Sequence, residues 1–319
     1  MFISCGDILV DLFNQPTDAI GKVSLQGHVG GSPLNVAVGL SRLGNNTGYL
    51  CKNSTDFIGQ GISEYIKTNG INPNWVIPTS LNSTLAMIRT NQDGSANYAF
   101  YTDNTADTSL RIDELPADFP DELAVLHFGS YSTAVEPTRT ALIALAHREA
   151  EKRVISYDPN LRPSVQTDMD IWQDSFAQLA KVADFVKASD EDIALLFGEN
   201  TSFESFAVDT LARGAKAVAV TEGGKGATVY TADGRSARSQ PLSIKVADTV
   251  GAGDTFQAAS LHWLYAQGCI NDGQLSLDDA NIEDWVNFAA VAAAITCTRS
   301  GADLPTLADI QNWPHAGNN

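Results

Sequence analysis

From about residue 120 onward, short apolar runs alternate with longer stretches of helical periodicity. Each run is short and uninterrupted, which is typical of a strand buried on both faces. Strands separated in this way by helices predict a parallel sheet with helices on both faces. Ligands of such sheets bind at the carboxyl ends of the strands. The expected strands are 123–129, 153–158, 184–189 and 217–223, and the expected helices lie near 137–151, 170–181 and 202–213.

The N-terminal third departs from this pattern. Residues 84–90 and 97–103 flank the stretch NQDGSA, whose Asp-Gly pair is a turn signal, so a hairpin is expected there. Strands standing apart from a parallel sheet, at about 10–30 and 84–103, would form a lid that keeps water from the strand ends. Antiparallel strands added to the edge of the main sheet are the alternative. Two helices are also expected, within 30–44 and near 57–69.

The composition is that of a globular domain. The chain of 319 residues is 44% hydrophobic and contains no run of 18 apolar residues. It has no internal repeat and no Pro/Ser-rich linker, so one domain over 1–319 is expected. Residues 1–13 lack the basic region and cleavage site of a secretion signal. We therefore expect them to form a first strand, and the protein to stay in the cytoplasm.

The formal net charge is −18 and basic residues are not clustered, which makes nucleic acid a poor partner. A bound nucleotide would need local positive potential from amides, a few basic side chains and a divalent cation.

Cysteine and histidine spacing shows no transition-metal pattern. The four cysteines lie far apart in mostly apolar surroundings, which favours reduced, packed thiols over disulfides or zinc. They are Cys5, Cys51, Cys269 and Cys297.

Residues 248–257 read DTVGAGDTFQ and open an apolar helical stretch that stops at Gly268. The unpaired amides at the start of a helix suit an anion. A carboxyl group beside them has two readings. Asp254 could be a simple helix cap after a glycine-rich turn. Alternatively, amides of residues 251–253 could hold a phosphoryl oxygen while Asp254 takes a proton from an attacking hydroxyl, as in a kinase.

Four motifs support the second reading: GGSPLN at 30–35, DPNLRP at 158–163, TEGGKGA at 221–227 and DTVGAGDTF at 248–256. Neither a Walker loop nor a protein-kinase glycine loop is present. With these motifs the chain resembles the PfkB, or ribokinase-like, carbohydrate kinases over nearly its whole length. HFGSYS and TAD, at 127–132 and 105–107, resemble the bacterial and plant fructokinases more than the ribokinases.

The resemblance implies a ribokinase-like α/β fold with a small β lid, and ATP-dependent phosphorylation of a sugar hydroxyl. Fructose is the first expectation, with 2-keto-3-deoxygluconate kinase and ribokinase as alternatives. A non-catalytic sugar or nucleotide sensor on the same fold would have lost the base or the glycines, and both are intact. No membrane partner is expected. Lid strands in the family often pair two subunits, so a homodimer through the lid is also open.

The resemblance also implies roles for individual residues. Asp254 would be the base, and the amides of Gly251, Ala252 and Gly253 would hold the phosphoryl group, with Arg162 close by. The sugar-binding residues would be Asp11, Gly30, Gly31, Asn35, Asn160 and Asp254.

The resemblance implies further residues that bind ATP and Mg²⁺. The nucleotide-binding residues implied are Ser189, Thr221, Gly223, Gly226, Gly251, Gly253 and Ala290. Asp192 would reach Mg²⁺ through water. Backbone carbonyl groups would enclose a potassium ion at Asp248, Val250, Thr296, Arg299 and Gly301.

Some positions depart from the family pattern. The family's NxxE element is here Ser189 and Asp192, and a glycine of its first signature is Ser54. Thr102 replaces an arginine of many fructokinases, and Ala290 stands where Asn or His is frequent. Thr102 leaves the identity of the sugar open.

Overall fold

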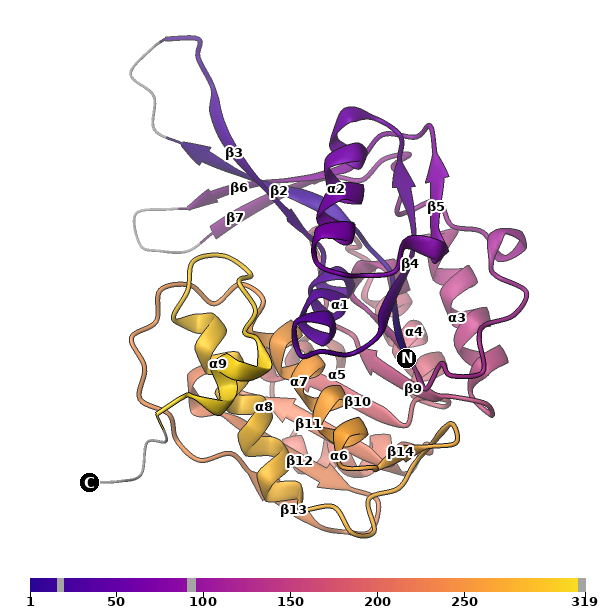
Figure 1. Ribbon diagram of the computed structural model, residues 1–319, viewed down its shortest axis with the longest axis vertical. Helices are drawn as coiled ribbons and strands as arrows, with labels where there is room; N and C mark the ends of the chain where they lie inside the picture. Colours follow the sequence, from indigo (N-terminus) through magenta and orange to yellow (C-terminus); the bar gives the residue numbers. More distant parts are fainter. Residues whose placement is uncertain (16–19, 91–95, 315–319) are drawn as a thin grey trace.

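The computed structural model describes residues 1–15, 20–90 and 96–314. Within them, the large sheet has the strand order β13-β12-β11-β10-β9-β8-β1-β4-β5 (Figure 1). Its strands are β1 (Phe2–Cys5), β4 (Thr47–Ser54), β5 (Val76–Thr79), β8 (Val125–Gly129), β9 (Val154–Asp158), β10 (Phe185–Ser189), β11 (Ala217–Thr221), β12 (Ala227–Thr231) and β13 (Ser236–Arg238).

The sheet is parallel from β5 to β11, and β12 and β13 continue it as antiparallel strands. All residues of β8 and β9 are buried, including the polar residues His127, Ser156 and Asp158, as expected of strands covered on both faces. The four strands expected after residue 120 are confirmed to within two residues at each end.

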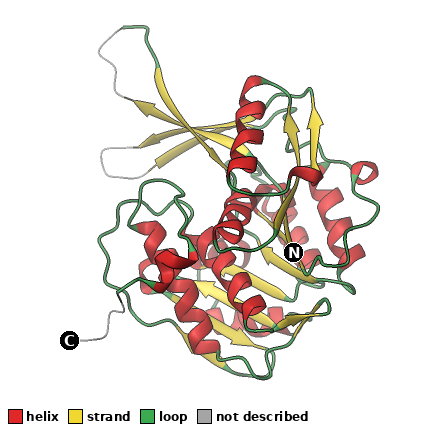
Figure 2. Cartoon of the chain, in the orientation of Figure 1, coloured by secondary structure: helices red, strands yellow, loops and turns green. Residues whose placement is uncertain are grey.

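Helices cover both faces of this sheet (Figure 2), which confirms the predicted α/β architecture. One face packs against α3 (Thr138–Glu149), α4 (Met169–Leu179), α5 (Asp190–Phe197) and α6 (Phe203–Leu211). The other packs against α1 (Ser32–Arg42), α7 (Ala252–Ala266) and α8 (Ile282–Cys297), with α9 (Leu307–Gln311) beside α8. α2 (Phe57–Thr68) packs on β4. The sequence did not suggest α5, a short helix directly after β10.

A second sheet, the lid sheet, stands apart from the body at the upper left of Figure 1. Its order is β3-β2-β6-β7, with β2 and β6 parallel and the outer pairs antiparallel. Its strands are β2 (Leu9–Gln15), β3 (Ser24–Gly30), β6 (Thr84–Thr90) and β7 (Ala96–Tyr101). The small sheet is therefore confirmed, and its strands are not added to the main sheet's edge. The turn expected between β6 and β7 lies outside the described residues.

The expectation of a single first strand over residues 1–13 is wrong. The chain bends after Cys5, at Gly6 with φ 147°. β1 enters the large sheet, whereas β2 begins at Leu9 and enters the lid sheet. Asp11 therefore lies on the lid sheet and not on a first strand of the main sheet.

Smaller elements complete the described chain. A two-stranded ribbon joins α7 to α8, and short 3-10 turns lie in several connections. The ribbon is β14 (Ile270–Asn271) and β15 (Gln274–Leu275), and the turns are Pro73–Trp75, Ile112–Glu114, Ser130–Thr133 and Gly223–Lys225.

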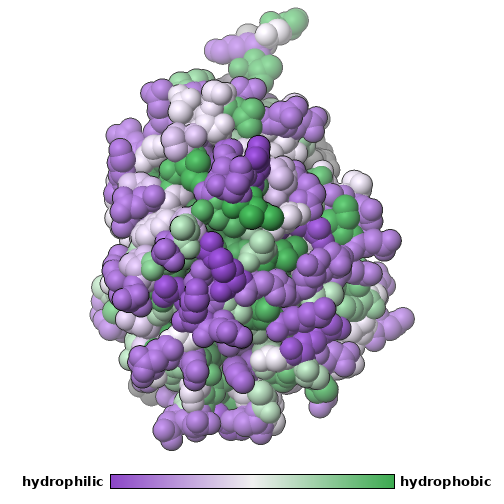
Figure 3. Space-filling view, turned by 90° about the vertical axis from the view of Figure 1, so that its right-hand side faces the viewer, coloured by the Kyte–Doolittle hydropathy of each residue, from purple (hydrophilic) through white to green (hydrophobic). Residues whose placement is uncertain are grey.

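The four cysteines are free, and all but Cys297 are buried, which agrees with the expected packed thiols. Hydrophilic residues predominate on the face shown in Figure 3 and interrupt its apolar areas. In the described part of the chain, none of the helices combines the length and apolar character needed to cross a bilayer.

Candidate active site

Asp254 lies in the first turn of α7, which begins directly after Gly251. Gly251 has left-handed backbone angles (φ 79°), so the chain turns sharply before the helix. The amide of Ala252 donates to the main-chain oxygen of Thr249 at 3.2 Å. The first amides of a helix have no intrahelical partner and carry partial positive charge, so this turn suits an anion.

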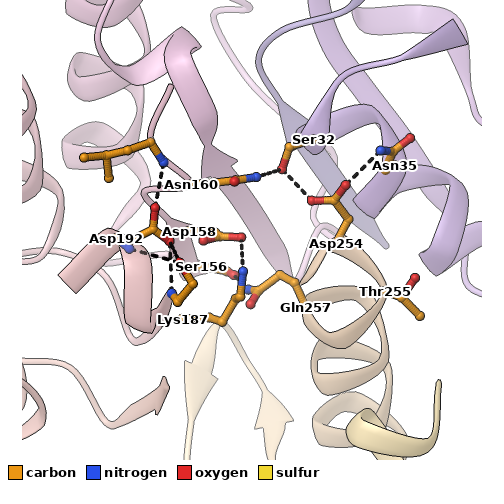
Figure 4. A network of polar contacts seen from close by, with 12 residues as sticks. Ser32, Asn35, Ser156, Asp158, Asn160, Lys187, Asp192, Asp254, Thr255 and Gln257 are labelled. Atoms are coloured by element: carbon orange, nitrogen blue, oxygen red, sulfur yellow. Dashed lines mark hydrogen bonds and ion pairs between the residues drawn. The ribbon is translucent and has the colours of Figure 1, made fainter. Parts of the chain in front are cut away.

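Both carboxylate oxygens of Asp254 accept hydrogen bonds from the first turn of α1 (Figure 4). The Ser32 hydroxyl donates to Oδ1 at 2.6 Å, and Nδ2 of Asn35 donates to Oδ2 at 2.8 Å. Asp254 is 6% exposed. The starts of α1 and α7 thus meet at this carboxylate and fix its orientation.

Asn160 joins this group from the segment after β9. Its Nδ2 donates to the Ser32 hydroxyl at 2.6 Å, and its Oδ1 accepts from Nη1 of Arg162 at 2.7 Å. Nη1 of Arg162 also donates to the main-chain oxygen of Leu161 at 2.8 Å. These contacts orient the Asn160 amide and place a cation beside the cluster.

Asp11 faces the same region from the lid sheet. Burial raises the pKa of Asp11 to about 6, while the Arg162 guanidinium lowers it and the Asp254 carboxylate raises it further. A β-carbon on Gly30 would lie 2.6 Å from Oδ2 of Asp11, so backbone and carboxylate are in close approach. The lid sheet therefore brings an acidic group toward the residues of the body.

Ser189 and Asp192 form a capping box at the start of α5. The main-chain amide and hydroxyl of Ser189 donate to Oδ2 of Asp192 at 2.9 and 2.6 Å. Oδ1 of Asp192 accepts from the Leu161 amide at 2.8 Å. Asp192 therefore ties α5 to the segment that carries Asn160.

The first residue of the DPNLRP segment, Asp158, takes part in a buried ion pair. Nζ of Lys187 is 2.7 Å from Oδ2 of Asp158, and the two side chains are 4% and 0% exposed. Burial raises the pKa of Asp158 to about 6, although the charge of Lys187 opposes this effect. Burial lowers the pKa of Lys187, but Asp158, Asp192 and Asp254 together outweigh burial and raise it. Lys187 is therefore a charged ammonium.

The residues expected at the nucleotide come from two neighbouring strands, the turn after the second strand, and α8. Ser189 and Thr221 end β10 and β11 and are partners in the parallel register. The turn with Gly223 and Gly226 follows Thr221 and is closed by a hydrogen bond from the Glu222 amide to the Gly226 oxygen. Ala290 lies on α8, which packs against β12, β13 and α7.

Three of the residues expected around a potassium ion, Asp248, Val250 and Gly301, are joined by hydrogen bonds. Oδ2 of Asp248 accepts from the Gly301 amide at 2.9 Å, and Oδ1 accepts from the Val250 amide at 3.1 Å. The hydroxyl of Thr296 lies 2.8 Å from that of Thr255 in α7. Arg299 pairs with Asp309 at 3.2 Å. The loop before α7 and the loop after α8 are therefore joined directly.

The sequence model of the pfkB family carbohydrate kinases matches residues 4–309. The chain belongs to this family. The resemblance inferred from the four motifs is thereby confirmed.

Similar proteins agree with the family. The chain is 35% identical over 280 residues to a fructokinase of Rhizobium leguminosarum bv. trifolii, covering 88% of this chain and 84% of that protein. Its fold is similar to that of a fructokinase from Xylella fastidiosa with bound ATP, with a TM-score of 0.87, 23% identity, and coverage of 97% and 96%. It is also similar to a Vibrio cholerae O395 fructokinase double mutant in a fructose, ADP and potassium ion bound form, with a TM-score of 0.83, 25% identity, and coverage of 97% and 96%.

Two features of this pfkB kinase were not found from its sequence. Ser32 lies within the GGSPLN motif but was given no role of its own, yet its hydroxyl links Asp254 to Asn160. Lys187 and Asp158 were read as strand residues, yet they form the buried pair. A lysine within an apolar run is the signal that could have drawn attention to the pair, because a buried lysine needs a partner.

Proposed function

We propose that this carbohydrate kinase transfers the γ-phosphate of ATP to D-fructose and produces fructose 6-phosphate. The observation that carries the proposal is the position of Asp254, a buried carboxylate at the anion-binding start of α7. The fructokinase relative and the Vibrio cholerae structure with fructose and ADP favour fructose as the acceptor.

In this mechanism the acceptor hydroxyl gives its proton to Asp254 as its oxygen attacks the γ-phosphorus. The bond from the γ-phosphorus to the bridging oxygen breaks, and ADP leaves with that electron pair. The amides of residues 251–253 and the guanidinium of Arg162 would stabilise the phosphoryl oxygens. Asp11, Gly30, Gly31, Asn35 and Asn160 would hold the sugar. Thr221, Gly223, Gly226, Ser189 and Ala290 would bound the nucleotide.

Mg²⁺ would neutralise the charge of ATP. In residues 1–15, 20–90 and 96–314, no group of three or more acidic, His or Cys side chains could hold a metal ion. Both oxygens of Asp192 accept protein hydrogen bonds. This donor set fits an ion held chiefly by phosphate and water, with Asp192 acting through water.

Potassium would bind main-chain carbonyl groups of Asp248, Val250, Thr296, Arg299 and Gly301. The direct hydrogen bond between Asp248 and Gly301 supports this site, because it brings the two segments together. The potassium ion named for the Vibrio cholerae fructokinase structure supports it as well.

The function is tested by ADP release in a coupled assay with fructose, ribose, 2-keto-3-deoxygluconate, mannose and nucleosides. We expect the highest kcat/KM with fructose in the presence of Mg²⁺, and a higher rate when K⁺ is added. A preference for 2-keto-3-deoxygluconate or ribose would replace fructose by that substrate. ATP or sugar binding without any turnover would identify a sensor.

The pH dependence of sugar binding follows from Asp11, whose pKa burial raises to about 6. Sugar hydroxyls donate hydrogen bonds to the ionised carboxylate, so binding favours that form. As the pH falls through about 6, Asp11 takes up a proton, and we expect the KM for fructose to rise. Initial rates at saturating ATP between pH 5 and 8 check this. The Asp11→Asn variant should show a high KM with little pH dependence, and a wild-type KM independent of pH would contradict the role of Asp11.

We also propose that two subunits pair through the lid sheet and that the enzyme acts in the cytoplasm. Val23, directly before β3, and Leu25, within it, are 69% and 40% exposed, which supports a partner on the lid sheet. Light scattering showing only the monomer mass of 34.0 kDa would contradict pairing. The four free cysteines support a reducing compartment, which cell fractionation can check.

A further inference from the structure

Gly253, the second glycine of the GAG turn, has an unusual neighbour. Gly253 is not one of the glycines with a positive φ in the described chain, so its backbone angles do not require glycine. A β-carbon at this position would instead lie 3.0 Å from Nζ of Lys187 and 3.8 Å from its Cε. The lysine ammonium therefore packs against the main chain of the turn that opens α7.

The Lys187 ammonium is held in this place by Asp158. The two groups are 2.7 Å apart, and Figure 4 shows the pair between Asp192 and the helix that carries Asp254. Oδ1 of Asp158 is buried and, among the described residues, has no hydrogen-bond partner. Burial of an ion pair costs free energy that imperfect hydrogen bonding does not recover. Stability of the fold is therefore a weak explanation for this pair.

The single positive charge of Lys187 lies among three carboxyl groups. Asp158, Asp192 and Asp254 all act on its ammonium, which is buried with them. Charges interact more strongly in such a site than in water. A phosphoryl group arriving at the turn would add further negative charge, and Nζ of Lys187 is the nearest heavy atom to a β-carbon placed on Gly253.

We infer that Lys187 is a positioning residue for phosphoryl transfer. Its ammonium, held by Asp158 beside Gly253, supplies fixed positive charge at the turn that opens α7. This charge favours the γ-phosphate over water at the turn and stabilises the charge that develops during transfer. The inference rests on the proposed kinase function and assigns a role to a residue that the motifs did not include.

The test compares Asp158→Asn with the double variant Asp158→Asn/Lys187→Met. Both lack the Asp158 carboxylate, so they differ only by the ammonium and a methionine of similar length. We expect kcat of the double variant to be about tenfold or more below that of Asp158→Asn, by the loss of one electrostatic contact. The KM for fructose should agree within about twofold, because the hydrogen bond and ion pair of Lys187 go to Asp158 and not to Asp11, Asn35 or Asn160. The ratio of ATP to ADP affinity, measured by calorimetry, should fall in the double variant.

Equal kcat and equal affinity ratios in the two variants would overturn the inference and leave Lys187 as a counterion of Asp158. Thermal unfolding of each variant checks the fold, and Asp158→Asn/Lys187→Gln serves if the methionine variant does not fold. The affinity ratio tests Lys187 even if wild type phosphorylates none of the sugars. In that case the proposed function fails by itself. An active wild type with two equivalent variants defeats only the role of Lys187.

Discussion

Replacement of Asp254 by Asn should lower kcat at least about a hundredfold, the lower range of general-base contributions. An amide cannot take the proton of the acceptor hydroxyl, although it can keep much of the hydrogen bonding. In the wild type the carboxylate accepts from Ser32 at 2.6 Å and from Asn35 at 2.8 Å. Because ATP would contact the amides of the turn and not this side chain, its affinity should stay within about twofold.

Single-turnover rates with saturating fructose, together with ATP binding by calorimetry, measure the Asp254→Asn effect. Asp56→Asn is the matched control. Asp56 also caps a helix, α2, and its carboxylate accepts hydrogen bonds from the Gly59 amide and the Ser83 hydroxyl. Asn is an equally good helix cap. We expect its turnover to be unchanged. If Asp254→Asn also keeps wild-type turnover, a different group removes the proton.

Gly31→Ala should damage both stability and sugar binding. Gly31 has φ 115°, and a β-carbon there would lie 2.5 Å from the main-chain oxygen of Asp7 and 3.1 Å from its carbonyl carbon. Main chain cannot move aside as a flexible side chain would. We expect the free energy of unfolding to fall by about 2–4 kcal/mol, from strain and steric displacement together. Displacement of the start of α1 would also shift Ser32 and Asn35, so the KM for fructose should rise about tenfold or more.

Urea denaturation and the KM for fructose measure the Gly31→Ala effect. Gly44→Ala is its control, because Gly44 also has a positive φ of 88° but a β-carbon there meets nothing within 4 Å. It should lose only the about 1–2 kcal/mol of a left-handed residue and keep its KM. Equal losses in the free energy of unfolding for the two variants would show that the contact with Asp7 does not contribute to the loss at Gly31.

Much of the architecture could be predicted because the decisive signals are local. Strands β8 and β9 are buried along their whole length, and they consist mainly of apolar residues. The motif residues follow the carboxyl ends of such strands, as Asn160 follows β9 and Thr221 ends β11. Parallel strands place those ends at one edge of the sheet, so the expected site residues converge.

The features that could not be predicted depend on tertiary contacts. The bend between β1 and β2 takes only residues 6–8, and Pro33 and Ser132, distant in sequence, pack against Gly6 at that point. Lys187 and Asp158 are 29 residues apart and lie on different strands. Strand periodicity says which face a side chain takes but not which distant partner it meets. The eight-residue helix α5 is too short for a clear helical period.

The bend between β1 and β2 has a further consequence. In the proposed mechanism it would divide recognition of the acceptor between two sheets, because Asp11 stands on one and Asp254 is carried by a helix packed on the other. A sugar that donates hydrogen bonds to both carboxylates would link the two sheets. A water molecule has a single oxygen atom, whereas a sugar carries several hydroxyl groups that could meet both carboxylates at once. Under the proposed mechanism, the same division would favour transfer to the sugar over wasteful hydrolysis of ATP.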